Sequence, residues 1–186
     1  GTPLEEVELR TGESIPVADN RFMVFKVVAT ENGIYSIGID RSSGESETVL
    51  IHHELGNTAK TREILSVPGE NLEADVLPVN GGRELFVSIG GNVMKISGNR
   101  KTRYDWDEPV SQLGYAGGVL YGIDIDGALV FWDAAKGDQL LQVYFFNDGG
   151  YIALPPDSRT IWASPGAIEN VVLYRDGRPV DPKRVS

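Results

Sequence analysis

The chain has 186 residues, of which 41% are hydrophobic and 24% charged, and its formal net charge is −10 at pH 7. These values are typical of a folded globular protein, and no apolar run approaches the roughly 20 residues that a membrane-spanning helix needs. The acidic balance argues against nucleic acid as a partner, because phosphate binding depends on clustered Lys and Arg. The lack of cysteine excludes disulfides, thiolate nucleophiles and cysteine-bound metals.

The sequence predicts a succession of short strands rather than helices. Runs rich in Val, Ile, Tyr and Phe are interrupted by Gly, Asn and Asp pairs about every 8 to 12 residues, which is typical of all-β sandwiches, barrels and propellers. In chain order the predicted strands are residues 4–10, 22–29, 32–40, 47–54, 62–67, 74–79, 82–91, 92–97, 102–106, 110–115, 117–127, 128–133, 140–146, 151–155, 158–166 and 170–175.

Four of these segments repeat one local pattern. Each has a turn, an aliphatic residue followed by an aromatic one, and a short strand that runs into a second turn. The repeated pairs are Ile34-Tyr35, Leu85-Phe86, Leu120-Tyr121 and Ile161-Trp162. Apolar strands precede and follow each copy, so the repeat predicts units of four antiparallel strands with the aromatics packed between neighbouring sheets.

Such units predict an all-β fold, a small β-propeller that forms a single domain over residues 1–186. The expected four-stranded antiparallel blades span about residues 18–67, 72–106, 109–146 and 150–176. The last blade lacks a fourth strand, and the N-terminal strand 4–10 is expected to complete it and close the ring. One alternative is a small β-sandwich domain at 1–67 followed by a partial propeller at 72–186, which can dimerise because its ring is incomplete. A fragment of a larger propeller is another.

Two segments carry a family resemblance. GALVFWDAAKGDQLLQV (127–143) resembles the WD40-like and quinoprotein-like β-propeller repeats, in which a third strand ends near Trp-Asp and a Gly turn follows. GYIALPPDSRTIWASPG (150–166) is similar to the last repeat of bacterial propellers that occur within larger proteins. The resemblance covers roughly residues 72–175. The Gly-His dipeptide of the WD40 signature and the Trp-rich quinone-binding motifs are absent, so the resemblance implies no cofactor.

Candidate catalytic and metal-binding residues are few. The two histidines, His52 and His53, are neighbours on a predicted strand. Their side chains therefore point to opposite faces and cannot share a metal, and one of them is expected to face outward. Asp124 and Asp126 fit a hairpin turn better than a calcium loop, because the residues after Gly127 offer no further side-chain oxygens. We expect no catalytic, cofactor-binding or metal-ligating residue.

One segment is predicted to bind a partner. Tyr104, Asp105, Trp106 and Asp107 combine two aromatic side chains with acidic ones beside a proline, near the junction of two expected blades. Aromatic anchors are favoured in binding hot spots. Trp106 also fits an alternative role as an apolar plug between blades.

These features predict a non-enzymatic interaction module, part of a larger bacterial or envelope protein, that binds a protein, a peptide or another ligand and needs no cofactor. A periplasmic or cell-surface location is favoured over the cytoplasm. The alternative function is a metal-dependent hydrolase or lyase, whose channel site would use Asp40, Asp75 or Asp124 from inner strands. Fold alone does not decide between these functions.

Overall fold

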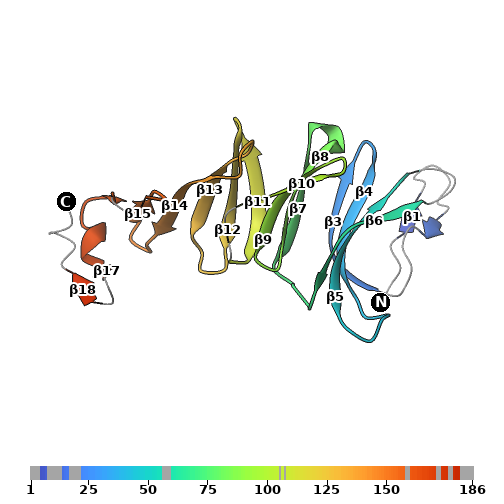
Figure 1. Cartoon of the computed structure of the whole chain (residues 1–186), viewed down its shortest axis with the longest axis horizontal. Coiled ribbons are helices and arrows are strands. Elements are labelled where there is room, and N and C mark those ends of the chain that lie inside the picture. Colours follow the sequence, from blue (N-terminus) through green and yellow to red (C-terminus); the bar gives the residue numbers. More distant parts are fainter. Residues whose placement is uncertain are drawn as a thin grey trace. The chain divides into compact units, whose positions relative to one another are not determined.

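The described residues form mainly antiparallel strands, and the chain divides into two units, Gly1–Leu113 and Gly114–Ser186 (Figure 1). The computed structural model describes residues 5–7, 14–16, 22–55, 60–104, 106, 108–157, 160–170, 173–175 and 178–180. Its helical elements there are two short 3₁₀ helices, η1 (Asn80–Gly82) and η2 (Ala167–Asn170). Within the described residues, no helix has the length and apolar character needed to cross a membrane.

The first sheet is a meander of four antiparallel strands in sequence order. Its strands are β3 (Phe22–Thr30), β4 (Gly33–Asp40), β5 (Glu47–His53) and β6 (Thr61–Pro68). All four lie where the sequence predicts strands. A tight turn at Asn32 joins β3 to β4, and Gly33 opens the new strand with a φ of 146° that side chains rarely adopt. Gly33 is also enclosed, because an added Cβ would overlap the carbonyl oxygen of His53.

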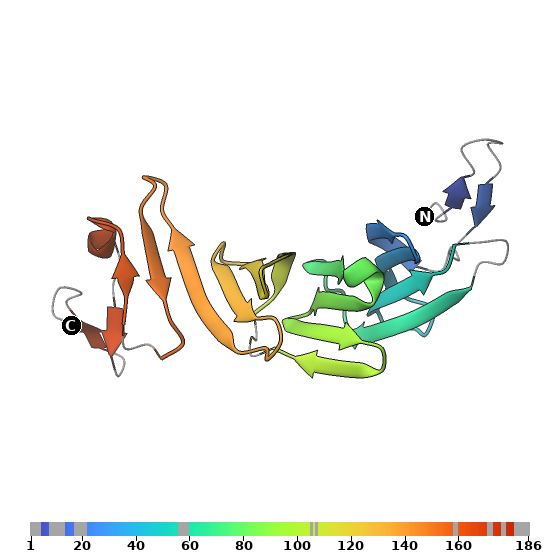
Figure 2. The same ribbon diagram turned by 90° about the horizontal axis from the view of Figure 1, so that it is seen from above.

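The second sheet repeats this arrangement. Its strands are β7 (Ala74–Val79), β8 (Glu84–Ile89), β9 (Asn92–Ser97) and β10 (Arg100–Arg103). Figure 2 shows the colour changing stepwise across these strands, as expected for a meander. The predicted fourth strand at 102–106 is shifted, since β10 begins at Arg100 and ends at Arg103.

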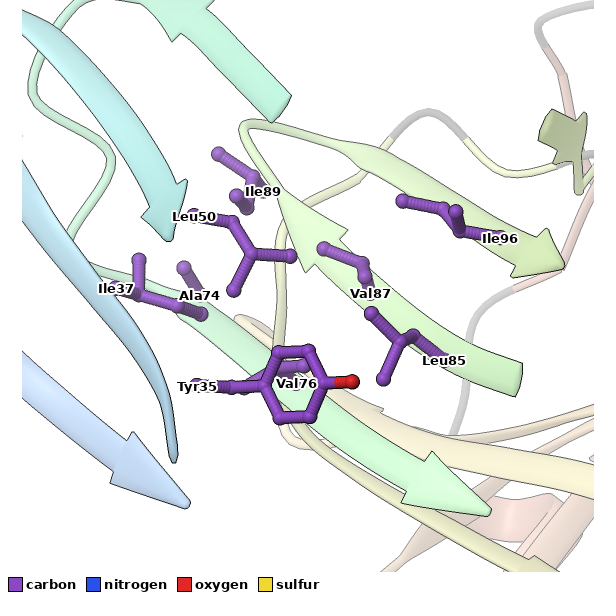
Figure 3. Packing of buried hydrophobic residues seen from close by; sticks show 9 residues of the cluster. All are labelled: Tyr35, Ile37, Leu50, Ala74, Val76, Leu85, Val87, Ile89 and Ile96. Atoms are coloured by element: carbon purple, nitrogen blue, oxygen red, sulfur yellow. The ribbon is translucent and has the colours of Figure 1, made fainter. Parts of the chain in front are cut away.

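The two sheets of the N-terminal unit pack face to face. Alternate residues of β4 and β5 meet alternate residues of β7, β8 and β9, because side chains on a strand point to its two faces in turn. Figure 3 shows the nine buried residues of this core, which are Tyr35, Ile37, Leu50, Ala74, Val76, Leu85, Val87, Ile89 and Ile96. Ile37, Leu50 and Val87 are fully buried. The burial of this apolar surface holds the two sheets together.

The third sheet has six antiparallel strands. These are β11 (Val110–Ala116), β12 (Val119–Asp124), β13 (Leu129–Asp133), β14 (Gln139–Phe145), β15 (Tyr151–Leu154) and β16 (Trp162–Ala163). The turn between β12 and β13 depends on Asp124, whose Oδ1 accepts hydrogen bonds from the N–H groups of Asp126 and Ala128 at 3.0 and 2.8 Å. This confirms the prediction of a hairpin turn at this position.

The fourth predicted blade does not form as expected. β15 pairs with β14 and extends the third sheet, because Gly149 and Gly150 close a tight turn in which Phe146 hydrogen-bonds to both glycines. The N-terminal strand β1 (Glu5–Val7) pairs with β2 (Ser14–Pro16). A second local pair joins β17 (Leu173–Arg175) to β18 (Arg178–Val180).

Ring closure through the N-terminal strand is therefore wrong, as is the count of four separate blades. Pairing with a neighbour in sequence closes a short loop at a lower entropic cost than pairing with a strand at the other end of the chain. The all-β class is confirmed, with antiparallel sheets of four, four and six strands, none of them closed.

Candidate functional site

The segment predicted to bind a partner lies directly after β10. Tyr104 is buried, with 1% of its surface exposed, and its ring packs against Phe86 at a centroid distance of 6.1 Å. Its N–H donates a hydrogen bond to the carbonyl oxygen of Val93, while the N–H of Trp106 bonds to the carbonyl of Tyr104. Asp105 and Asp107 lie outside the described residues. The partner-binding role of this segment stays a prediction.

The two histidines point to opposite faces of the first sheet, and both are buried. The Nε2 atom of His53 lies 2.7 Å from the hydroxyl oxygen of Ser36. The ring of His52 stacks on Tyr35 at a centroid distance of 4.6 Å. The expectation that one histidine faces outward is wrong, because side chains on both faces of β5 are buried.

The carboxylates proposed for a metal site each have a local role. Asp75 is buried on β7, where its Oδ1 pairs with Lys26 Nζ at 2.8 Å and its Oδ2 accepts a hydrogen bond from the N–H of Leu113. Asp40 accepts a hydrogen bond from the N–H of Ser42, and Asp124 holds the β12–β13 turn. Across the described ranges of the chain, no group of three or more His, Asp or Glu residues is placed to hold a metal ion.

An apolar surface on the third sheet is the most prominent candidate site. The strand register places Val143 opposite Ala153 and Phe145 opposite Tyr151, and Ala153 in turn lies opposite Trp162. These side chains consequently share one face of the sheet. Together they line a hollow of about 430 Å³ that we call the apolar face, which consists of Leu141, Val143, Phe145, Tyr151, Ala153 and Trp162.

Three aromatic residues of the apolar face are open to solvent. The exposed fractions are 62% for Phe145, 41% for Tyr151 and 53% for Trp162, whereas Val143 and Ala153 beneath them are buried. No residue of the apolar face carries a charge. Single apolar residues scattered over a surface are common and need no explanation, whereas contiguous exposed apolar surfaces mark interaction sites.

Several carboxylates elsewhere on the third sheet accept hydrogen bonds within turns. The side chain of Asp133 accepts hydrogen bonds from the N–H groups of Lys136 and Ala135, which lower the pKa of the carboxyl. Burial raises the pKa of Tyr144, and the carboxylates of Asp124 and Asp126 raise it further. The lowered pKa keeps the Asp133 carboxyl ionised at neutral pH.

Sequence patterning predicts that the repeated aromatics are all packed between sheets. Tyr35 and Phe86 are buried, with exposed fractions of 5% and 1%, but Tyr121 and Trp162 are exposed at 36% and 53%. The pattern identified the strands and missed the exposed face, because the same alternation of apolar residues describes a covered face and an open one. The glycine pair after Phe146 is the sequence feature that indicates a tight turn, and a tight turn there predicts that β15 pairs with β14.

Comparisons with known proteins add little to this site. No protein-family model matches the chain, and no curated protein matches its sequence. A chain in the crystal structure of the mitotic checkpoint complex is similar over 87% of this chain and 74% of that chain, with 11% sequence identity and a TM-score of 0.37. A likeness with so low a TM-score carries no argument about fold or function.

Proposed function

We propose that this chain is a non-enzymatic interaction module of the propeller type, and that it binds a protein or peptide partner on the apolar face. The exposure of Phe145, Tyr151 and Trp162 on one uncharged surface is the observation that carries this proposal. Large aromatic side chains contribute most to protein interfaces when a partner removes them from water.

The propeller assignment is supported by the repeated meanders. Two four-stranded sheets with strands in sequence order pack face to face in the N-terminal unit. The first four strands of the third sheet, β11 to β14, follow the same order. In propellers, blades of this construction bury their faces against one another, so a sheet with an uncovered apolar face is suited to receive a further apolar surface.

The partner is expected to present aliphatic or aromatic side chains from an extended segment or a sheet. Alternate residues of such a segment all point to one side and would match the spacing of the strands beneath. Neutral or basic residues are expected around that contact, because the chain carries a net charge of −10 and a strongly acidic partner would be repelled.

Site-specific photo-crosslinking tests the proposal. A photoreactive phenylalanine analogue replaces Tyr151 on the apolar face or, as a control, Ile125, which is 54% exposed in the β12–β13 turn. The captured protein is then purified, and its affinity is measured by calorimetry for the unmodified chain and for the variants Phe145→Asp and Ile125→Asp.

Capture is expected from position 151 alone. Phe145→Asp should weaken binding by about 30-fold or more, the effect of removing a hot-spot residue, whereas Ile125→Asp should leave the affinity unchanged. Equal capture from both positions, or an affinity that Phe145→Asp does not alter, would contradict the proposal.

A further inference from the structure

A second hollow lies between the two sheets of the N-terminal unit, away from the apolar face. The strand register aligns Tyr35, His52 and Arg62 in a row across the first sheet. It aligns Leu85, Ile96 and Lys101 in a row across the second sheet. Members of both rows line a cavity of about 470 Å³. We call it the inter-sheet cavity.

The floor of the inter-sheet cavity is apolar and rigid. Tyr35, Leu85 and Ile96 are buried members of the core and have at most 6% of their surfaces exposed. The hydroxyl of Tyr35 donates a hydrogen bond to the carbonyl oxygen of Gly82 at 3.2 Å, and its ring stacks on His52. A floor held in this way loses little conformational entropy when a ligand binds to it.

The rim of the inter-sheet cavity is cationic. Arg62 lies on β6, Arg83 follows η1 and Lys101 lies on β10, and Glu63 is the one carboxylate among the lining residues. Burial raises the pKa of the Tyr35 hydroxyl, and the charge of Arg62 opposes that rise.

The three cations of the rim differ from other basic residues of this unit. Other basic residues of the same unit form ion pairs, namely Lys26 with Asp75, Arg41 with Glu70 and Lys95 with Glu84. Among the residues that the structure describes, no carboxylate forms an ion pair with Arg62, Arg83 or Lys101. Acidic residues outnumber basic ones 27 to 17 in this chain, so three cations beside a single carboxylate, Glu63, are a local departure from that balance.

We propose that the inter-sheet cavity binds a small organic dianion, a molecule with two carboxylate or phosphate groups on a flat apolar body. The apolar body would lie on Tyr35, Leu85 and Ile96. The guanidinium groups of Arg62 and Arg83 suit bidentate hydrogen bonds to carboxylate or phosphate, and Lys101 adds a compact positive charge. The volume lies within the range of small-molecule sites.

Calorimetric titration with naphthalene-2,6-dicarboxylate tests the inference, and naphthalene-2,6-dimethanol serves as a neutral probe of the same shape. The dicarboxylate should bind with a stoichiometry of one, more weakly as salt is raised because the contact is between charges, and the diol should bind at least about ten-fold more weakly. In the Arg62→Gln/Lys101→Gln variant the dicarboxylate affinity should fall by about ten-fold for each cation removed.

A matched double variant controls for the overall charge. Arg100→Gln/Lys136→Gln removes the same two charges from exposed residues outside the cavity lining and should bind the dicarboxylate as the unmodified chain does. Equal binding of the diol and the dicarboxylate, an unchanged affinity in Arg62→Gln/Lys101→Gln, or an equal loss in both double variants would overturn the inference. Phe145 does not line the inter-sheet cavity. The Phe145→Asp variant therefore tests partner binding on the apolar face independently of dianion binding in this cavity.

Discussion

Replacing Leu50 by alanine tests whether the two sheets of the N-terminal unit are packed as one core. Leu50 lies on β5, is fully buried and belongs to the cluster that β4 and β5 share with β7, β8 and β9. Removing its isobutyl group loses apolar burial and leaves a cavity in a close-packed region. Leu→Ala changes of this kind cost about 2–5 kcal/mol, a large part of the roughly 5–15 kcal/mol by which domains are stable.

Urea denaturation followed by circular dichroism measures this loss. Leu72→Ala is the control, because Leu72 is 56% exposed in the connection between the sheets and should cost less than about 0.5 kcal/mol. A double-mutant cycle with Val87→Ala then isolates the contact between the sheets, since residues that share a cavity couple by about 0.5–3 kcal/mol. If Leu50→Ala costs no more than Leu72→Ala, or if Leu50→Ala and Val87→Ala are strictly additive, the face-to-face packing of the sheets is refuted.

Three further predictions concern single residues. Gly33→Ala should destabilise the N-terminal unit by at least about 2 kcal/mol, because its Cβ would overlap the His53 carbonyl. The control is Gly81→Ala, which should cost about 1 kcal/mol because Gly81 has a φ of 67° but lies in open space. Equal losses of stability for the two variants in urea melts would count against this reasoning. Asp124→Ala removes the acceptor of two hydrogen bonds and should lower stability by about 2 kcal/mol, measured by the same melts; a neutral effect would show that the turn forms without it. Hydrogen bonds from Lys95 and Asn80 lower the pKa of Glu84, so its contribution to stability is present above about pH 4.5 and is lost as the pH falls through the lower folded-state pKa. Glu84→Gln should therefore flatten the acid side of a stability profile, and an unchanged slope would exclude this carboxylate as its source.

The candidate sites were much less predictable than the strands. Tyr104 attracts attention in the sequence because it stands beside acidic residues, but its ring is buried against Phe86. The apolar face combines residues of β14, β15 and β16, and its alternating pattern does not differ from that of a covered sheet. Arg62 and Lys101 belong to different sheets and both line the inter-sheet cavity. No local sequence pattern predicts that they lie in the same cavity.

The sequence by itself determined the class of fold, the strands and most of their turns. Alternating apolar residues and glycine-containing turns act over a few residues, so their consequences can be read locally. This local information places β3 to β9 within one or two residues of their observed positions.

Only the tertiary structure decided how the strands divide into sheets and which faces meet. Gly149 and Gly150 turn β15 back onto β14, and the expected fourth blade becomes an extension of the third sheet. Strand partners and covered faces depend on competition among many possible pairings, whose free energies differ through burial and loop closure rather than through local preference. For the same reason, the exposure of Trp162 and the burial of Tyr35 follow from what packs against each sheet.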